Sequence, residues 1–328
     1  MRTPEFWTSH SAAAKAVSAA LAPLGALYGL SVRAASSRAR PYRSPTRVLC
    51  VGNLTAGGAG KTPVAIALGQ MLSARGRKIV FLSRGYHGRA HGPLAVDTRR
   101  HSAADVGDEA LLLAARAKTV VSRDRAKGAK LAETLGADII VMDDGFQNFQ
   151  LEKDLSIVVI DATSGFGNGR LIPAGPLREL PCDGLKRADA VVLMGDGTPD
   201  IPPFKGPVFR AQLVPTAPES VAGHTVLAFA GIGRPEKFFR TLHQIGARVI
   251  TTQSFADHHR YTAPELLALK SAAKTAGALL VTTEKDFVRM HGDPLLKALA
   301  ARAHTLPVTM VVEEADELRR LVMSKLLR

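Results

Sequence analysis

The feature that most constrains this chain is the segment TAGGAGKTP, residues 55–63, which directly follows the apolar run VLCVGNL. Small residues followed by Lys and Thr are typical of a phosphate-binding loop, whose full pattern is G-x-x-x-x-G-K-[ST] between a strand and a helix. Counting back from Gly60 places Thr55 where the first glycine of that pattern stands. The apolar run before the loop and the helix signal after it still predict a nucleotide site.

The residue types in this loop suit phosphate binding. Its three glycines allow backbone N–H groups to close around phosphate oxygens. Lys61 can reach the outer phosphates, Thr62 can bind Mg²⁺, and Pro63 suits the first turn of a helix whose N-terminus faces the anion. The residues that we expect to contact the nucleotide here are Thr55, Ala56, Gly57, Gly58, Ala59, Gly60, Lys61 and Thr62.

From Arg47 onward, β-rich apolar runs alternate with helix-like segments; the runs are VLCVGN, KIVFLS, TVVS, DIIVMDD, LSIVVID and AVVLMG. This alternation predicts a mostly parallel sheet covered on both faces. Pro and Gly cluster through 195–207, and a second set of runs extends from TVLAFAGIG to PVTMVVEE. We therefore expect an α/β fold, with a P-loop NTPase-like core in residues 37–205 and a second, smaller α/β domain in residues 206–328.

The N-terminal segment differs from the rest of the chain. Residues 16–32 carry no charge, and several arginines follow between positions 33 and 47. A membrane-spanning helix needs about 20 apolar residues, so the segment is marginal as a span. A signal peptide, a mitochondrial-type presequence and a buried first helix are the alternatives. We favour a membrane-associating helix in residues 1–36, with the arginines at the anionic cytoplasmic face.

The amino-acid composition limits the kinds of molecule that the protein is expected to bind. The formal net charge of +14 favours an anionic partner, such as a nucleic acid, a membrane surface or a phosphorylated substrate. Only 5% of the residues are aromatic, which disfavours single-stranded nucleic acid because that binding mode uses aromatic stacking. Cys50 and Cys182 form neither a metal-binding spacing nor a disulfide framework, so a reducing compartment is expected.

Further polar groups follow the apolar runs. Asp143 and Asp144 end the run DIIVMDD, where a carboxylate beside Mg²⁺ is expected in P-loop enzymes. An Asp at a strand end is also common as a turn or cap residue, but the upstream loop favours metal binding. The adjoining turn places Gln147 and Asn148 at the same edge.

Two classes of P-loop protein are disfavoured because the chain lacks their characteristic residues. TTEKD places Lys285 and Asp286 side by side, which is the wrong spacing for guanine recognition and typical of a salt-bridged turn. Partitioning-type ATPases carry a Lys where Ala56 stands. A kinase instead needs a base for the acceptor hydroxyl. The candidates for that base are Asp108, Glu109, Asp257, His258 and His259, and the basic groups that could surround phosphate are Arg84, Arg123, Arg125 and Arg178.

Eight segments in order strengthen the kinase interpretation: VGNLTAGGAGKTP, LSRGYHG, VGDE, DDGFQ, LIPAGPLRE, FAGIGRPEKFF, DHH and VTTEKD. Together they resemble the tetraacyldisaccharide 4'-kinase family of lipid A biosynthesis, over roughly residues 48–286. The resemblance implies transfer of the ATP γ-phosphate to the 4'-hydroxyl of a tetraacyldisaccharide 1-phosphate. It also implies work at the cytoplasmic face of the inner membrane of a Gram-negative bacterium, without nucleic acid or an obligatory protein partner.

The resemblance also implies roles for individual residues. Asp108 would be the base for the sugar hydroxyl, tuned by His258, and Lys61 would act on the phosphates of ATP. The carboxylates and hydroxyl implied around Mg²⁺ are Thr62, Asp144, Glu109 and Glu179, and the side chains implied at the phosphate-transfer site are Gln147, Arg123 and Arg178. Many relatives have His after DDGFQ, where Asn148 stands here.

A second functional class is a membrane-associated ATPase or GTPase switch that acts through a protein partner. Such a switch hydrolyses nucleotide without a lipid acceptor and needs no acceptor base. The GDE and DHH segments, which supply candidate bases, favour the kinase.

Overall fold

A nine-stranded sheet is the centre of the protein in the computed structural model, which describes residues 4–9 and 11–327. Neighbouring strands pair in parallel, except for the two edge pairs β13–β8 and β3–β4. In spatial order the strands are β13 (Val308–Val312), β8 (Val208–Pro215), β7 (Ala190–Met194), β6 (Leu155–Asp161), β1 (Arg47–Gly52), β5 (Ile139–Asp143), β2 (Ile79–Ser83), β4 (Thr119–Val121) and β3 (Leu94–Ala95). The predicted mostly parallel α/β sheet is confirmed.

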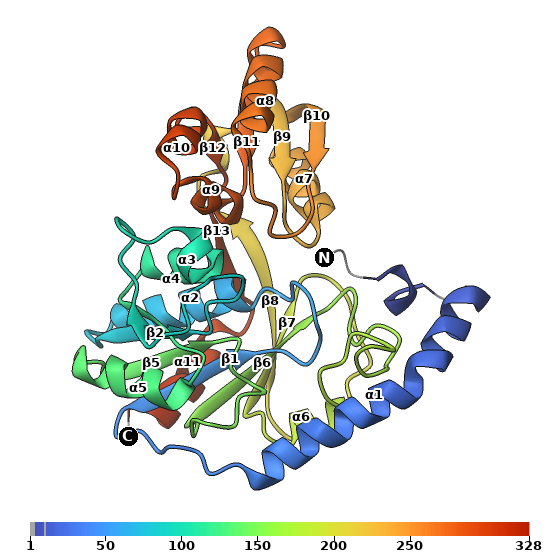
Figure 1. Ribbon diagram of the computed structural model, residues 1–328, viewed down its shortest axis with the longest axis vertical. Helices are drawn as coiled ribbons and strands as arrows, with labels where there is room; N and C mark the ends of the chain where they lie inside the picture. The colour runs from blue at the N-terminus through green and yellow to red at the C-terminus, as the bar shows by residue number, and fades with distance from the viewer. Residues whose placement is uncertain (1–3, 10, 328) are drawn as a thin grey trace.

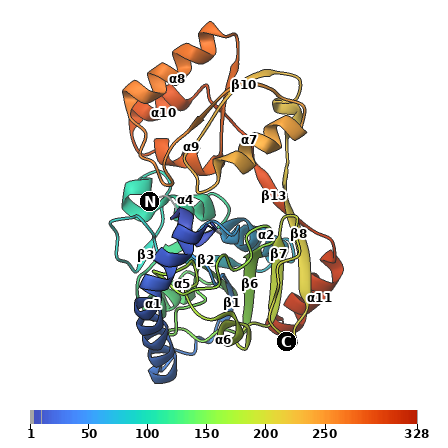
Figure 2. The ribbon, with the colours of Figure 1, turned by 90° about the vertical axis from the view of Figure 1, so that its right-hand side faces the viewer.

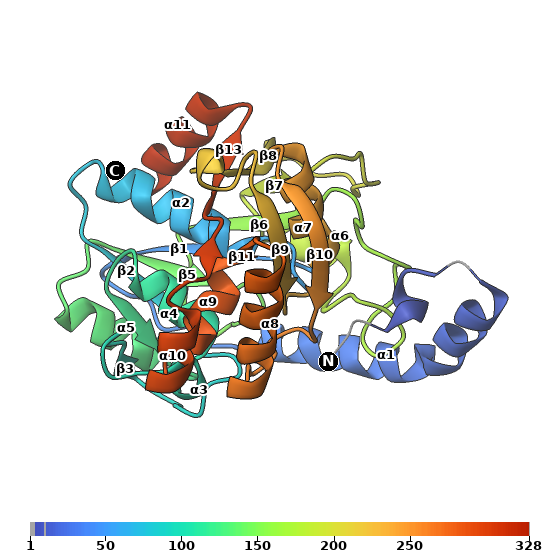
Figure 3. The same cartoon turned by 90° about the horizontal axis from the view of Figure 1, so that it is seen from above.

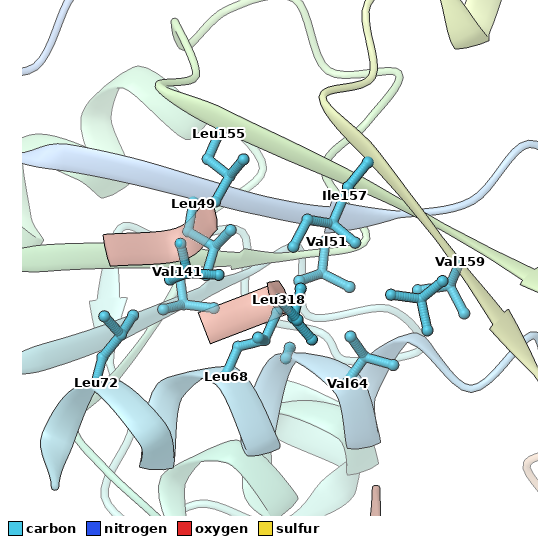
Figure 4. Packing of buried hydrophobic residues seen from close by; sticks show 14 of the residues in the cluster. Leu49, Val51, Val64, Leu68, Leu72, Val141, Leu155, Ile157, Val159 and Leu318 are labelled. Atoms are coloured by element: carbon cyan, nitrogen blue, oxygen red, sulfur yellow. The ribbon is translucent and has the colours of Figure 1, made fainter. Parts of the chain in front are cut away.

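Helices cover both faces of this sheet because the central strands are apolar on both sides. On one face, Leu49 and Val51 of β1 pack with the helices α2 (Lys61–Ser73), α4 (Asp108–Ala114) and α11 (Ala315–Leu326). Figure 4 shows this layer, with Val64, Leu68 and Leu72 of α2 directed at the strands. On the other face lie α5 (Arg125–Thr134) and α6 (Pro181–Leu185), and α3 (Ala103–Val106) precedes α4.

A smaller parallel sheet forms a second unit beside the first (Figures 1 and 2). Its strands, in spatial order, are β10 (Arg248–Ser254), β9 (Thr225–Ala230), β11 (Leu279–Thr282) and β12 (His304–Thr305). α7 (Pro235–Gln244) packs on one face. The other face is covered by α8 (Ala263–Thr275), α9 (Glu284–Met290) and α10 (Pro294–Ala300). Two short 3₁₀ helices, η1 (Glu5–Trp7) and η2 (Pro218–Ser220), complete the elements.

The boundary between the two units differs from the division expected after residue 205, because segments after that residue also belong to the large sheet. β8 pairs with β7 of the large sheet, and β13 returns antiparallel to β8, so that PVTMVVEE belongs to the large sheet and not to the small one. α11 then packs Leu318, Val322 and Leu326 into the core of the large sheet. The smaller unit is therefore inserted between β8 and β13, and the larger unit contains both the middle and the end of the chain.

The N-terminal helix α1 (Ala12–Arg38) lies along one side of the larger unit (Figures 1 and 3). The expected boundary at residue 36 falls inside this helix, and residues 1–3 and 10 of that segment, like residue 328, lie outside the described residues. One stripe of α1 is held: Ser18 Oγ donates to the Ala174 carbonyl at 2.7 Å, and Gly25 packs against Leu171.

The opposite stripe of α1 is open to solvent. Leu24, Leu27 and Leu30 are 54%, 64% and 59% exposed, so the helix is not an ordinary buried core helix. By length and composition α1 could cross a membrane, although signal sequences pass the same test. A stripe of exposed leucines on a long helix is typical of a helix that contacts lipid.

Candidate active site

The phosphate-binding loop takes its shape from its glycines. Gly57 and Gly60 have φ values of 116° and 87°, a region that residues with a Cβ rarely adopt. α2 begins directly after Gly60, so its unpaired N–H groups face the loop. Thr55 forms a β-bridge with Leu177, and Ala56 N donates to the Pro176 carbonyl at 2.7 Å. The backbone of Thr55 is thus extended, a conformation that any residue can adopt. This explains why a threonine can stand where the usual pattern has its first glycine.

The loop opens into a cavity of about 1640 Å³ that both units line. α2, β5 and the segment after β2 contribute from the larger unit. The 231–234 loop, α7 and the segment around His258 contribute from the smaller one. His87, Asp144 and His258 have positive φ values of 62°, 51° and 57°, and all three line this cavity. Strained non-glycine backbone therefore gathers at this cavity, as it does at functional sites.

Asp143 has the geometry of a metal-binding carboxylate. Its Oδ2 accepts a hydrogen bond of 2.9 Å from Thr62 Oγ1, while its Oδ1 is buried without a hydrogen-bond partner. Burial raises the pKa of Asp143 to about 7, with further contributions from the charges of Glu109 and Asp144. A buried carboxylate that lacks a cation and adjoins a loop hydroxyl fits Mg²⁺, which prefers one or two carboxylates plus phosphate oxygens.

Asp144, the expected metal ligand, is engaged by cations. Arg178 donates to both of its carboxylate oxygens, at 2.6 and 3.1 Å, and Lys61 Nζ lies 3.7 Å away. Burial alone raises the pKa of Asp144, but Lys61 and Arg178 outweigh burial and hold the pKa below its ordinary value. In this arrangement the carboxylate orients Lys61 and Arg178 toward the cavity that all three side chains line.

The two expected glutamates lie apart. Glu109 lines the cavity and receives Lys285 Nζ at 3.2 Å. Glu179 is buried and paired with Arg187 at 2.7 Å, and it lines a separate groove along α1. Gln147 connects that glutamate with the cavity, because its Nε2 donates to Glu179 at 2.9 Å.

The remaining expected side chains can also be placed. Arg123 lines the cavity together with Arg84 and Arg125. Asn148 Nδ2 donates to Gln150 Oε1 at 3.1 Å. His259 bonds to Glu265 at 3.1 Å, away from Asp108, as a supporting group would.

Asp108 and His258 meet across the two units. His258 Nδ1 lies 2.9 Å from Asp108 Oδ2, and Arg289 approaches the same oxygen with Nε at 2.7 Å and Nη2 at 2.6 Å. Burial by itself raises the pKa of Asp108. The hydrogen bond from His258 and the charges of Lys285 and Arg289 outweigh burial and hold the pKa below its ordinary value. Asp108 is 3% exposed, and His258 is the member of the pair that lines the cavity.

Arg289 is the partner that sequence reasoning missed. It lies one helical turn after Asp286 of the VTTEKD segment and donates to Asp286 Oδ1 at 2.7 Å. Asp286 is fully buried and also receives the Tyr261 hydroxyl at 2.9 Å. The salt-bridged turn predicted for Lys285 and Asp286 is replaced by two other pairs: Lys285 pairs with Glu109, and Asp286 anchors the arginine that reaches Asp108. The sequence does contain a signal for this arginine, because Arg289 stands three residues after Asp286, a spacing at which two side chains of a helix can pair.

Comparison with known proteins gives the same assignment as this geometry. The model of one protein family, LpxK, described as tetraacyldisaccharide-1-P 4'-kinase, matches residues 17–327. The chain belongs to this kinase family. A tetraacyldisaccharide 4'-kinase of Rhodospirillum centenum is 49% identical, covering 98% of this chain and 96% of the relative. One of Paramagnetospirillum magneticum is 52% identical, covering 94% of each.

The solved structures add a member of the same family. The crystal structure of LpxK from Aquifex aeolicus, described as an "apo" form in complex with ATP, has a TM-score of 0.75 to this chain at 27% sequence identity. It covers 94% of this chain, and 99% of the Aquifex chain is covered in turn. The P-loop kinase fold and the family predicted from the sequence are confirmed.

Asp143→Asn is a test of the metal-binding geometry in this kinase fold. Because the pKa of Asp143 in the folded protein lies above its unfolded value of 3.8, burial of this carboxyl costs stability increasingly as pH rises toward about 7. The Asn variant should therefore unfold at a higher temperature than the wild type at pH 8 without Mg²⁺, by about 2 °C or more, and the difference should shrink toward pH 4. Thermal unfolding across pH measures this.

The same variant should lose Mg²⁺-dependent nucleotide binding. Asp189→Asn is the control, because it removes a carboxylate that pairs with Lys325 away from the cavity. Equal melting temperatures of the Asp143 variant and wild type at pH 8, with Mg²⁺ dependence retained, would contradict the metal assignment.

Proposed function

We propose that this protein transfers the γ-phosphate of ATP to the 4'-hydroxyl of a tetraacyldisaccharide 1-phosphate. One observation carries the proposal: the phosphate-binding loop and the Asp108–His258 pair line or adjoin the same cavity in a chain of this kinase family. A switch that only hydrolyses nucleotide needs no such pair. The charge of +14 also suits a phosphorylated lipid and its membrane.

The roles of the nucleotide-binding residues follow from their positions. Loop residues 55–62 would hold the phosphates, with Lys61 and Arg178 neutralising charge on the transferred group. Thr62 and Asp143 would hold Mg²⁺, which supplies charge neutralisation at the phosphate oxygens, and the charge of Glu109 adds to the negative potential at Asp143. Gln147, Arg123 and Asp144 complete the wall around the transferred group.

The acceptor hydroxyl would be deprotonated by the Asp108–His258 pair. Both oxygens of Asp108 are occupied: Oδ1 accepts from Glu109 N at 2.9 Å, and Oδ2 faces His258 and Arg289. The carboxylate therefore holds the imidazole in place, while His258 presents the pair to the cavity. Phosphoryl transfer needs alignment and charge neutralisation more than covalent help, so this fixed geometry is the main contribution of the pair.

The decisive experiment is label transfer from γ-labelled ATP to a tetraacylated disaccharide 1-phosphate in detergent micelles. We expect a labelled bisphosphorylated lipid that requires Mg²⁺. Phosphate release at the same rate with and without the lipid, and no labelled lipid, would favour the ATPase or GTPase switch instead.

The exposed stripe of α1 would bind the protein to the cytoplasmic face of the inner membrane of a Gram-negative bacterium. Changing Leu24, Leu27 and Leu30 together to serine should move the full-length protein from the membrane fraction to the soluble one, because it removes exposed apolar area that would enter the bilayer. Leu267→Ser, a 52% exposed leucine on α8, is the matched control.

Activity measurements distinguish a loss of membrane binding from a loss of folded protein in this test. The triple variant should keep its melting temperature and its activity on substrate in micelles, and lose activity on substrate in vesicles. If the triple variant stays in the membrane fraction, α1 does not bind the membrane through these leucines and only packs on the larger unit.

A further inference from the structure

One loop of the smaller unit supports the backbone of His258. Residues 231–234 connect β9 with α7, and the Gly231 carbonyl accepts His258 N at 3.1 Å and Arg289 Nη1 at 2.6 Å. Gly231 N donates to Asp286 Oδ1 at 3.0 Å. Both residues whose side chains face Asp108 are therefore bonded to the beginning of this loop, His258 through its backbone N–H and Arg289 through its guanidinium.

The other end of the loop is bonded to the larger unit through Asp161, the last residue of β6. Arg234 Nη1 lies 2.9 Å from Asp161 Oδ1, and Lys237 Nζ lies 2.6 Å from Oδ2. The carboxylate is held in place on its own side by backbone N–H groups of Thr163 at 3.2 Å and Ser164 at 2.9 Å. Its side chain is only 5% exposed. Asp161 is thus a prearranged, buried acceptor for two cations of the other unit.

The charge of Asp161 is secured by these cations. Burial by itself raises the pKa of Asp161, but the hydrogen bond from Lys237 and the charge of Arg234 outweigh burial and lower the pKa to about 2. The carboxylate is therefore ionised throughout the physiological range. Because the carboxylate is buried, water and salt screen these ion pairs less than they screen fully exposed pairs.

We propose that Asp161 is a positioning residue for phosphoryl transfer: its ion pairs with Arg234 and Lys237 fix the 231–234 loop, which in turn holds His258 beside Asp108. This inference rests on the proposed function. His258 has a φ of 57°, a conformation that needs support from its surroundings. The phosphate-binding loop and Asp108 belong to the larger unit, whereas His258 belongs to the smaller one. The Asp161 ion pairs, together with the Arg289–Asp108 and Lys285–Glu109 contacts, hold the two units at this distance.

Two alternative roles for these residues make different predictions. If Arg234 and Lys237, which line the cavity, chiefly bind ATP phosphates, their loss should raise the KM for ATP. If Asp161 serves only folding, its loss should lower stability and leave the kcat of the folded fraction unchanged. A positioning role lowers kcat while ATP binding to the intact loop persists.

The test is Asp161→Asn in the full-length enzyme, with label transfer to the lipid disaccharide as the assay. We expect kcat to fall by at least about tenfold, because a displacement of about 1 Å at a catalytic group costs up to about 10²-fold. The KM for ATP should stay within about threefold. Asp189→Asn is the control, since it removes a carboxylate that pairs with Lys325 within the larger unit, and its kcat should equal that of wild type.

A second variant and a distance measurement complete the test. Lys237→Met should lower kcat in the same direction, and the double variant Asp161→Asn with Lys237→Met should lose less than the product of the two single losses. Dye labels on the exposed Cys182 and on a cysteine introduced by Leu267→Cys should move apart in the Asp161 variant.

Each outcome decides the inference. Wild-type kcat in both Asp161→Asn and Lys237→Met, or a raised KM for ATP at unchanged kcat, would overturn it and leave the proposed function intact. If Asp161→Asn does not fold, the Lys237→Met variant decides, because Lys237 is 41% exposed and Arg234 still pairs with the buried carboxylate of Asp161. Absence of lipid labelling by the wild type would instead reject the proposed function.

Discussion

Lys61→Ala is expected to lower phosphoryl transfer by roughly 10³-fold, the upper range for removing one group that stabilises a developing charge. Lys61 is the first residue of α2, and its side chain, which lines the cavity, is 11% exposed. No other lysine of the loop can replace it, since residues 55–60 contain only Thr, Ala and Gly. Initial rates of label transfer at saturating ATP measure the loss.

The control for this variant is Lys127→Ala on α5, whose side chain is 69% exposed and pairs with Asp124 on the surface. It should transfer phosphate at the wild-type rate. The Lys61 variant should also melt near the wild-type temperature, because Asp144 keeps its two bonds to Arg178. Transfer within about threefold of wild type would remove the phosphate-binding role from residues 55–62.

Asp108→Asn is expected to reduce turnover by at least about 10²-fold, the lower range for the loss of a general base. The amide keeps the size of the carboxylate but removes the negative charge that faces His258 and Arg289. ATP binding should change little, since the loop and Asp143 are untouched. His258→Ala should act in the same direction, and the double variant should be less than additive if the two side chains act as a unit.

Measurements of nucleotide affinity and of turnover against Mg²⁺ distinguish this role from metal binding. If Asp108 were a metal ligand, the Asn variant would bind Mg²⁺·ATP more weakly, and excess Mg²⁺ would restore part of the rate. Asp105→Asn is the control, because Asp105 also pairs with an arginine, Arg89, but outside the cavity. Rescue by Mg²⁺ would move Asp108 to the metal site and leave His258 as the base.

Much of the fold could be predicted because the central strands are apolar along their whole length. β1 buries Leu49 and Val51 on one face and Val48 and Cys50 on the other, which is the pattern of a parallel strand between helices. The sheet to which PVTMVVEE belongs could not be predicted, because an edge strand such as β13 carries no signal for its neighbour. The chain therefore returns to the large sheet where the sequence suggested the small one.

The candidate site divides in the same way. The loop residues follow from local chemistry, so Lys61 and Thr62 could be predicted from a short motif. Asp143 bonds to Thr62, whereas Asp144 bonds to Arg178. Which aspartate has which partner depends on the direction of two adjacent side chains at the end of β5, and the motif does not specify this direction. The i, i+3 spacing indicates the pair of Arg289 with Asp286, but it does not indicate the contact of Arg289 with Asp108. That contact and the ion pairs of Asp161 join segments far apart in the sequence.

The return of the chain to the large sheet has a consequence for synthesis on the ribosome. β13 completes one edge of that sheet, and α11 covers Leu49 and its neighbours with Leu318, Val322 and Leu326. These residues follow the whole inserted unit along the chain, so the nascent core of the larger unit keeps an apolar face uncovered until that unit has been made. A frameshift or stop codon after the whole inserted unit has been made would still leave that core incomplete, and such products would be substrates for chaperones and proteases.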